Sequence, residues 1–403
     1  MSTPSVLISG ASIAGPALAS WLARAGWDVT VVERFDELRD EGQNIDVRGT
    51  GREVLRRMGL EEAVRAAHTH ETGLDFVDER GRPVARFAAG TDDTSGGTAE
   101  LEILRGRLGQ ILYDHSSAEA AYVFGDQITA LHDDGHGVDV EFRHGPARRF
   151  DAVVLAEGLR SRTRAMVLGD ARVHELGVYS AYLTIPRTEA DNDRWRWLIC
   201  DRGRAVTLRP DDVGTIRAGL NVLSSVRGLD RLDRTGVVTV LRATFADVGW
   251  ETPRILDALD DAPLYFEALG QARLPRWSSG RIALLGDAAH CASPMSGMST
   301  TLALTGAYVL AGELVQHADP HTAFARYEAT MRPFVEKAQQ LRPGIPRMVY
   351  PHTRRQRSLV WAGLRTATSP LANRFGDVAG AVFSPPADAF RLPDRPLAAR
   401  REG

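Results

Sequence analysis

Lysine and cysteine are scarce in this sequence. Of the 49 basic residues only Lys337 is a lysine, so a mechanism that needs a catalytic lysine has a single candidate. The two cysteines, Cys200 and Cys291, are too few for a disulfide framework, and their spacing matches no zinc site. We therefore expect a reducing compartment, the cytoplasm, and no metal centre.

A strong charge of either sign is also missing. The formal net charge is -3 over 403 residues, whereas nucleic-acid and membrane-surface partners usually require a basic excess. Two uncharged runs, at 4–23 and 288–312, each contain glycine and proline, and no basic segment precedes the first. These absences favour a small-molecule ligand, with no nucleic-acid partner and no membrane partner.

The chain opens with a pattern that predicts a strand, a tight turn, a helix and a second strand. Residues 6–9 and 27–33 are typical of buried strands, and 16–25 of a helix that begins at a proline. The turn between them, residues 10–15, has the sequence G-A-S-I-A-G. It is a variant of the dinucleotide-binding pattern, with Ser12 in place of the second glycine.

This turn predicts a nucleotide site. Backbone N–H groups and the positive end of the helix can face a pyrophosphate, and the small residues Ser12 and Ala14 allow a close approach. Glu33 ends the second strand 23 residues after Gly10, where a carboxylate can accept the ribose hydroxyls of an adenine nucleotide. FAD and NAD both carry such a ribose, and the pattern does not choose between them.

The choice comes from a second motif at residues 281–290, R-I-A-L-L-G-D-A-A-H, which Pro294 and Gly297 follow. This arrangement resembles the flavin-ribityl motif of the para-hydroxybenzoate hydroxylase family. The resemblance implies that Asp287 accepts a hydrogen bond from a ribityl hydroxyl of FAD and that Pro294 lies beside the isoalloxazine. His290 is interpreted as a structural polar residue.

A third motif at 151–164, D-A-V-V-L-A-E-G-L-R-S-R-T-R, resembles the middle motif of the same family. The sequence departs from the family at Glu157, where aspartate is usual, and at Gly297-Met298-Ser299, which replaces Gly-Gln-Gly. Within the family the sequence is most similar to tetracycline-degrading and aromatic-polyketide monooxygenases. The cofactor-binding residues that the resemblance implies are Gly10, Ser12, Ala14, Gly15, Glu33, Arg34, Asp46, Arg105, Gly158, Gly286, Asp287, Pro294, Gly297, Met298 and Ser299.

The implied fold is α/β, with a Rossmann-like FAD-binding domain of the GR2 type that a β-sheet substrate domain interrupts, and with helices at the C-terminus. The expected segments are 1–72, 101–172 and 276–320 for the FAD-binding domain, a hairpin at 73–100 and a sheet at 173–275 for the substrate domain, a helical region at 321–392 and a disordered tail at 393–403.

The implied activity is hydroxylation of a small aromatic or polyketide-like molecule through a flavin C4a-hydroperoxide, with NADPH or NADH as a transient reductant and O2 as co-substrate. The flavin carries the chemistry, so no catalytic side chain is predicted, and the site needs a dry pocket. The candidate pocket walls are Tyr182, Trp195, Trp197, Leu208 and Met295. A monomer or a homodimer is expected.

Three alternatives remain at this point. Trp195-Arg196-Trp197-Leu198-Ile199 partly copies a motif of flavin-dependent halogenases, although Cys200 replaces its last proline and the N-terminal half has no lysine. A flavin dehydrogenase without oxygen insertion is the second reading, and a flavin-binding module without turnover is the third.

Overall fold

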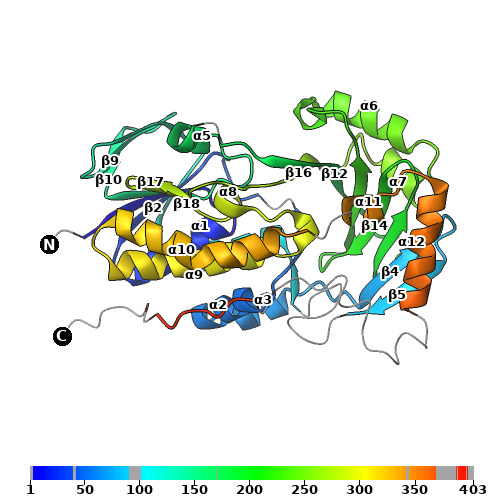
Figure 1. Cartoon of the computed structure of the whole chain (residues 1–403), viewed down its shortest axis with the longest axis horizontal. Coiled ribbons are helices and arrows are strands. Elements are labelled where there is room, and N and C mark those ends of the chain that lie inside the picture. The colour runs from blue at the N-terminus through cyan, green and yellow to red at the C-terminus, as the bar shows by residue number, and fades with distance from the viewer. Residues whose placement is uncertain are drawn as a thin grey trace.

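The computed structural model describes residues 3–39, 42–89, 101–169, 171–341, 345–368, 387, 389–395 and 397. These residues form two lobes, each built around one large β-sheet (Figure 1). The fold class agrees with the α/β prediction. Among the helices that the structure describes, none has the length and hydropathy that crossing a bilayer would require.

The first lobe contains a six-stranded sheet with the strand order β17-β18-β11-β1-β2-β7. Its strands are β1 (Ser5–Ser9), β2 (Asp28–Glu33), β7 (Ala121–Phe124), β11 (Ala152–Leu155), β17 (Ser278–Ser279) and β18 (Ile282–Leu284). Neighbours from β18 to β7 pair in parallel, so the carboxyl ends of these strands lie at one edge. The turns at Gly10, Gly158 and Gly286 leave this edge, where open α/β sheets bind ligands.

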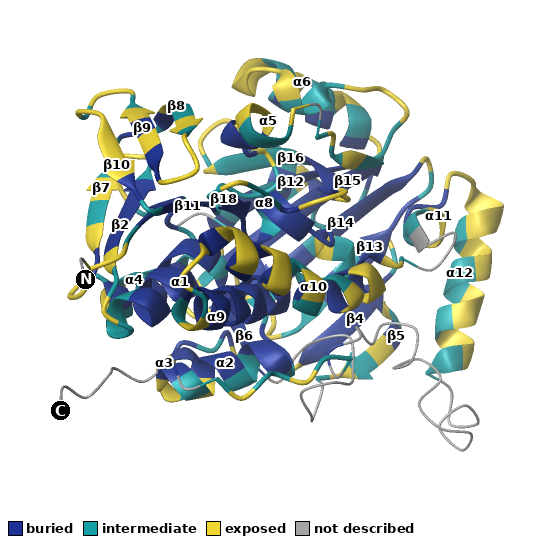
Figure 2. Cartoon of the chain, turned by 60° about the vertical axis from the view of Figure 1, so that its left-hand side comes forward, coloured by how far each residue is buried: buried dark blue, intermediate teal, exposed yellow. Residues whose placement is uncertain are grey.

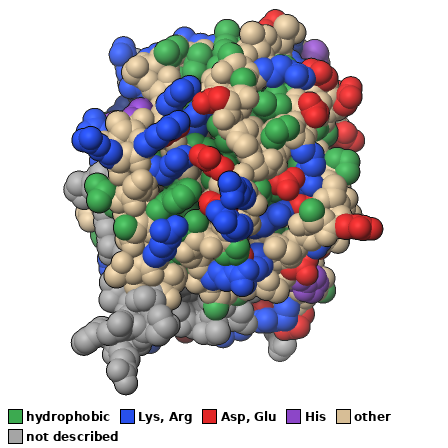
Figure 3. Space-filling view, turned by 90° about the vertical axis from the view of Figure 1, so that its right-hand side faces the viewer, with side chains coloured by type: hydrophobic (Ala, Val, Ile, Leu, Met, Phe, Trp, Pro, Cys, Tyr) green, Lys and Arg blue, Asp and Glu red, His purple; other side chains and the backbone are tan. Residues whose placement is uncertain are grey.

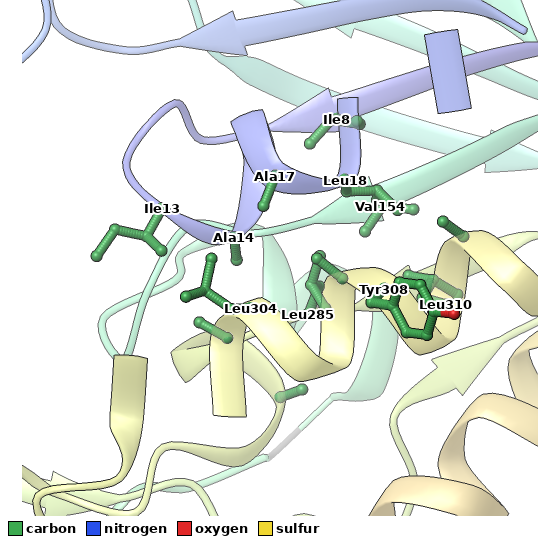
Figure 4. Close-up of a cluster of buried hydrophobic side chains, with 14 of the residues drawn as sticks. Ile8, Ile13, Ala14, Ala17, Leu18, Val154, Leu285, Leu304, Tyr308 and Leu310 are labelled. Atoms are coloured by element: carbon green, nitrogen blue, oxygen red, sulfur yellow. The ribbon is translucent and has the colours of Figure 1, made fainter. Parts of the chain in front are cut away.

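Helices cover this sheet and exclude water from it. They are α1 (Ala14–Arg24), α4 (Arg105–Ser116), α9 (Ser299–Gln316) and α10 (Pro320–Gln339). In Figure 2, α1 and α9 are buried along most of their length. Figure 4 shows part of this core: Leu18 of α1 lies beside Val154 of the sheet, and Leu304 of α9 lies near Ala14 and Leu285 in the same buried cluster. The uncharged run at 288–312 is therefore core rather than a membrane segment.

The second lobe contains a seven-stranded sheet with the order β16-β12-β15-β14-β13-β4-β5. Its strands are β4 (Gly73–Val77), β5 (Pro83–Ala88), β12 (His174–Pro186), β13 (Trp195–Ile199), β14 (Arg204–Pro210), β15 (Thr215–Leu223) and β16 (Leu264–Gln271). β4 pairs in parallel with β13, which places the hairpin in this sheet. Two helices, α6 (Arg234–Phe245) and α7 (Thr252–Asp257), cover one face, and the other face turns toward the first lobe.

The remaining elements are smaller. Two more sheets contain β8 (Ile128–Asp133), β9 (Val138–Phe142) and β10 (Arg148–Phe150), and β3 (Asn44–Asp46) with β6 (Glu102–Leu104). The short helices are α2 (Thr50–Met58), α3 (Glu61–Ala66), α5 (Thr163–Leu168), α8 (Asp287–His290), α11 (Ile345–Val349) and two 3-10 turns at Leu229–Arg231 and Pro294–Ser296.

The C-terminal helix α12 (Arg354–Ala367) packs on β5 at the outer end of the second lobe. On that face, arginine and acidic side chains are interspersed (Figure 3). Two ion pairs join α12 to the sheet lobe, because Arg357 lies 2.7 Å from Glu79 and Arg354 lies 3.4 Å from Asp201. The described helices of the predicted C-terminal region thus include α10 on the first lobe and α12 on the second.

Part of the predicted disordered tail is anchored instead. Arg395 forms hydrogen bonds with Glu313 and Gln316 of α9. The Tyr308 hydroxyl lies 3.1 Å from the Pro393 carbonyl oxygen, and Leu397 is buried. Ion pairing with the buried Glu313 fixes this segment, which the composition of the tail alone did not indicate. Residues 398–403 lie outside the described residues.

Candidate active site

The Gly10 turn has the geometry that a pyrophosphate needs. At Gly10, where φ is 110°, a Cβ atom would lie 2.5 Å from the Ala156 carbonyl oxygen. At Gly15 a Cβ would lie 1.9 Å from the Gly10 carbonyl oxygen, so both positions require glycine. No side chain caps the start of α1 at Ile13, and its first turn has no acidic residue. The N–H groups at this helix end are therefore available to an anion.

Glu33 lies at the end of β2 beside this turn. Its Oε2 accepts a hydrogen bond of 2.8 Å from the Ala11 N–H, and its Oε1 accepts one of 3.2 Å from the Phe35 N–H. A carboxylate offers about four acceptor positions, so this side chain can hold the turn and still accept ribose hydroxyls. Arg34 is exposed, with its guanidinium 4.7 Å above the Phe35 ring.

The second glycine turn lies against the first. At Gly286, where φ is 62°, a Cβ would come within 2.9 Å of the Ala14 Cβ. Leu285 and Ala14 lie close together in Figure 4 as well. Residues that are more than 270 positions apart in the sequence thus meet at one edge of the sheet. One dinucleotide can contact both turns.

Asp287 is the first residue of α8 and lies near Arg105. Burial raises the pKa of Asp287, and the Arg105 charge, the Cys291 thiol and the Ser299 hydroxyl partly offset this increase. Arg105 in turn donates a hydrogen bond of 3.1 Å to the Ser12 Oγ. Arg105 is therefore bonded to the Gly10 turn and close enough for its charge to act on the Asp287 carboxyl, so one ligand could contact both.

The loop after α8 is strained and ends in an uncapped helix. Ser293 has φ 77° although it is not a glycine, a conformation that costs about 1–3 kcal/mol and is common at functional sites. Pro294 is exposed, and Met298 is buried. Ser299 starts α9, and its Oγ is buried with no hydrogen-bond partner of normal geometry among the described residues. A buried hydroxyl beside the Asp287 carboxyl at a helix N-terminus fits a polar edge of a ligand.

The third motif contains the predicted site residue Gly158 and its neighbour Glu157, where the sequence departs from the family. Gly158 has φ 76° in the turn after β11, with open space around its α-carbon. Glu157 beside it accepts hydrogen bonds of 2.7 Å from the hydroxyls of Ser9, Ser161 and Thr163. At this departure from the family, the Glu157 carboxylate therefore joins the end of β1 to the loop at 161–163.

Asp46 and His290 have structural partners. Asp46 lies 2.9 Å from Arg48 and 3.3 Å from Arg209, so its carboxylate is already paired. The His290 ring contacts the Tyr327 hydroxyl at 3.0 Å, and burial lowers the pKa of His290 to about 3. His290 is thus a neutral core residue, as its sequence interpretation stated.

The candidate pocket residues do not all share one face of the sheet. Tyr182, Trp195 and Trp197 lie on the face toward the first lobe, and Met295 packs against this region. Leu208 does not line it. Because neighbouring strand residues point to opposite faces, Thr207 and Arg209 take the inner face while Leu208 is fully buried beneath α6.

Two side chains on the inner face were missed by the sequence analysis. Tyr265 of β16 stacks on Tyr182 with ring centroids 6.2 Å apart, and its hydroxyl donates a hydrogen bond of 3.1 Å to Glu267. Burial raises the pKa of Glu267, and the nearby Asp287 charge raises it further. The alternation of polar residues in this strand, at 265 and 267, was the available signal.

Comparison with known sequences identifies the family. The profile described as FAD binding domain matches residues 3–341. The chain belongs to this family. FAD is therefore its cofactor, and the two glycine turns, Ser299 and Asp287 supply the kinds of groups that this dinucleotide needs.

Similar proteins agree with this assignment. A flavin-dependent monooxygenase, eupH, of Phoma sp is 36% identical, with 88% of this chain and 89% of that protein covered. A flavin-dependent monooxygenase of Legionella longbeachae is 34% identical, with 83% and 87% covered. The crystal structure of the tetracycline destructase Tet(51) superposes with a TM-score of 0.80 at 29% identity, with 98% and 100% covered. The chain is an FAD-dependent monooxygenase, and the predicted resemblance to the para-hydroxybenzoate hydroxylase family is confirmed.

Proposed function

We propose that this monooxygenase uses NADPH or NADH and O2 to hydroxylate a small aromatic or polyketide-like molecule. The observation that carries the proposal is the contact between the Gly10 and Gly286 turns beside the inner face of the sheet lobe. The two turns are so close that a Cβ added at Gly286 would lie 2.9 Å from the Ala14 Cβ. A dinucleotide bound across these turns would present its reactive end to that face.

Residues of both turns would hold FAD. The N–H groups at the start of α1 would bind the pyrophosphate, and Glu33 the adenosine ribose. Asp287 would accept a hydrogen bond from the ribityl chain, and the Ser299 hydroxyl with the start of α9 would face the flavin ring. The Arg105 guanidinium, 3.1 Å from the Ser12 Oγ, would lie against a phosphate. Arg34 and Asp46 would bind the adenosine part of FAD only if they gave up their present contacts, which are with Phe35 for Arg34 and with Arg48 and Arg209 for Asp46.

When bound, FAD supplies the redox chemistry by accepting a hydride and activating oxygen. The chain's own task is to bind, orient and exclude water. Pro294 and Gly297 would border the flavin, and Met295 would pack between this loop and the sheet. The wall opposite contains Tyr182 and Tyr265 and, across β14 and β15, the tilted pair Trp195 and Trp197, whose rings are 5.1 Å apart. Aromatic side chains on this face would help to keep water from the reacting atoms.

The halogenase reading has little support in the site. Trp197 stacks on Phe76 and contacts Trp195 at a tilt, and Arg196 between the two tryptophans points to the opposite face, where it pairs with Asp191. The one lysine, Lys337, lies near the end of α10. We further propose that the enzyme acts in the cytoplasm as a monomer or homodimer, in keeping with two free, buried cysteines.

A labelled-oxygen experiment tests the proposal. The FAD-loaded enzyme is incubated with NADPH or NADH, a panel of naphthol and anthraquinone phenols, and isotopically labelled dioxygen. We expect substrate-stimulated NAD(P)H oxidation, oxygen uptake and a product that has gained one labelled oxygen atom. Substrate-dependent NAD(P)H oxidation with no oxygen consumed would contradict the proposal and favour a flavin dehydrogenase.

A further inference from the structure

The arginines on the inner face of the sheet lobe are already paired with acids. The Arg209 guanidinium lies 2.7 Å from both Glu71 and Glu102. The Arg217 Nε lies 3.1 Å from Asp211. Neither arginine is therefore available to bind a carboxylate of a substrate, because that would require an existing buried ion pair to break.

Glu267 differs from these acids. Within the part of the chain that the structure describes, no basic side chain lies within ion-pair distance of its carboxylate, and its hydrogen-bond partner is the Tyr265 hydroxyl at 3.1 Å. Arg105 and Arg160 act on it only from farther away, since Arg105 bonds to Ser12 and Arg160 pairs with Asp230 at 2.6 Å. The carboxylate thus has acceptor capacity left over.

Hydrogen bonds place the end of β16, the strand that carries Glu267, beside the flavin loop. The Ala272 N–H donates to the Cys291 carbonyl oxygen at 3.1 Å, and the Gln271 side chain donates to the Ala292 carbonyl oxygen at 3.0 Å. Residues 267, 269 and 271 share one face of β16, because side chains alternate along a strand. Leu269 packs with Met295 in the same cluster, and Glu267 follows it toward Tyr265.

The neighbouring strand leaves the Glu267 carboxylate without a further partner. Ser180 lies opposite Glu267 on β12, and its hydroxyl donates a hydrogen bond of 2.7 Å to the Asn221 side chain. Ser180 is therefore engaged with β15 and not with Glu267. The acceptor positions of Glu267 are left for a ligand that enters between β16 and the loop at Met295.

We propose that Glu267 is a specificity-determining residue, which accepts a hydrogen bond from a hydroxyl or amino group of the substrate and excludes substrates that bear a carboxylate there. The proposal rests on the proposed function. The Asp287 charge acts on Glu267, so a substrate carboxylate beside Glu267 would meet two acids. Arg209 and Arg217 already hold acids, the Arg105 guanidinium is bonded to Ser12, and the Arg39 guanidinium lies over the Tyr265 ring. Like charges in a partly buried site disfavour binding. The preferred substrate class is an uncharged or cationic phenol or enol.

Paired ligands test this inference. Emodin is a polyketide phenol, and endocrocin is emodin with one added ring carboxylate. Each is titrated into the FAD-loaded enzyme while the change in flavin absorbance is followed. We expect emodin to bind at least about tenfold more tightly than endocrocin, the effect of roughly 1.4 kcal/mol. In Glu267→Gln, which keeps the shape of the side chain, the ratio should fall to about one to threefold.

The control is Glu189→Gln, the same change at an exposed position after β12, which should keep the wild-type ratio. Flavin content, measured first, shows that each variant retains the cofactor site. The inference is overturned if endocrocin binds the wild-type enzyme as tightly as emodin, if neither compound binds, or if Glu267→Gln keeps the wild-type preference. Failure of the proposed function would instead appear as absent oxygen-coupled turnover with every phenol tested.

Discussion

Replacing Gly286 with alanine perturbs the contact on which the cofactor site depends. The backbone there has φ 62° and ψ -142°, a combination that residues with a side chain rarely adopt. The added Cβ would lie 2.9 Å from the Ala14 Cβ, whereas two carbon atoms normally approach to about 3.5–4.0 Å. The Gly10 and Gly286 turns must therefore separate by roughly 0.6 Å or more, or the new side chain must displace the backbone.

Both effects act on the bound cofactor. Backbone strain of this kind costs about 1–3 kcal/mol. If both turns contact one FAD molecule, the protein can relieve part of this strain by moving the turns apart. FAD then binds more weakly, because it can no longer contact both turns in their original positions. We expect the dissociation constant for FAD to rise by about tenfold to a hundredfold, which corresponds to roughly 1.4–2.7 kcal/mol.

The assay is FAD rebinding to the apoprotein, followed by flavin fluorescence, together with thermal unfolding. Gly26→Ala is the matched control, because Gly26 also has a positive φ, 84°, but has no atom within 4 Å of the added Cβ and lies at the far end of α1. That variant should lose stability without losing FAD affinity. The reasoning is refuted if Gly286→Ala binds FAD as tightly as the wild type.

Two other substitutions have effects that follow from the structure. Asp287→Ala should weaken FAD binding by about 1–3 kcal/mol through loss of a buried hydrogen bond, whereas Asp212→Ala at an exposed turn should not, and equal affinity in both would argue against the ribityl role. Burial raises the pKa of Glu71 well above its usual value of 4.5. The contribution of Glu71 to folding stability is therefore complete below pH 4.5 and is lost as the pH rises through the raised pKa. Denaturant unfolding at acidic and alkaline pH should therefore show Glu71→Gln gaining stability relative to the wild type as the pH rises, and a difference that is constant with pH would contradict this.

Much of the first lobe could be predicted from local sequence. The strands expected at 6–9 and 27–33 are β1 and β2, and the helix expected at 16–25 is α1, because apolar runs and flanking glycine and proline fix such elements locally. The glycine turns could be predicted because only glycine fits at these positions. A side chain at Gly10 would clash with a carbonyl oxygen, and one at Gly286 would clash with a neighbouring Cβ.

The inner face of the second lobe was harder to predict. Leu208 and Thr207 are adjacent in sequence but lie on opposite faces, and only the position of α6 decides which face is core. Asp46 pairs with Arg209, 163 residues away, and no local pattern reveals such a partner. The alternation of polar residues at 265 and 267 indicates a polar strand face, but only the loop at Cys291, which β16 meets, makes Glu267 part of the site.

A crystal structure of the enzyme with FAD tests the central claim most directly. Our account predicts that the pyrophosphate lies at the Gly10 turn, that a ribityl hydroxyl lies within hydrogen-bond distance of the Asp287 carboxylate, and that the flavin ring borders Pro294 and faces the sheet lobe. A dinucleotide that contacts the Gly10 turn while its flavin end lies away from Asp287 and Ser299 would contradict the account.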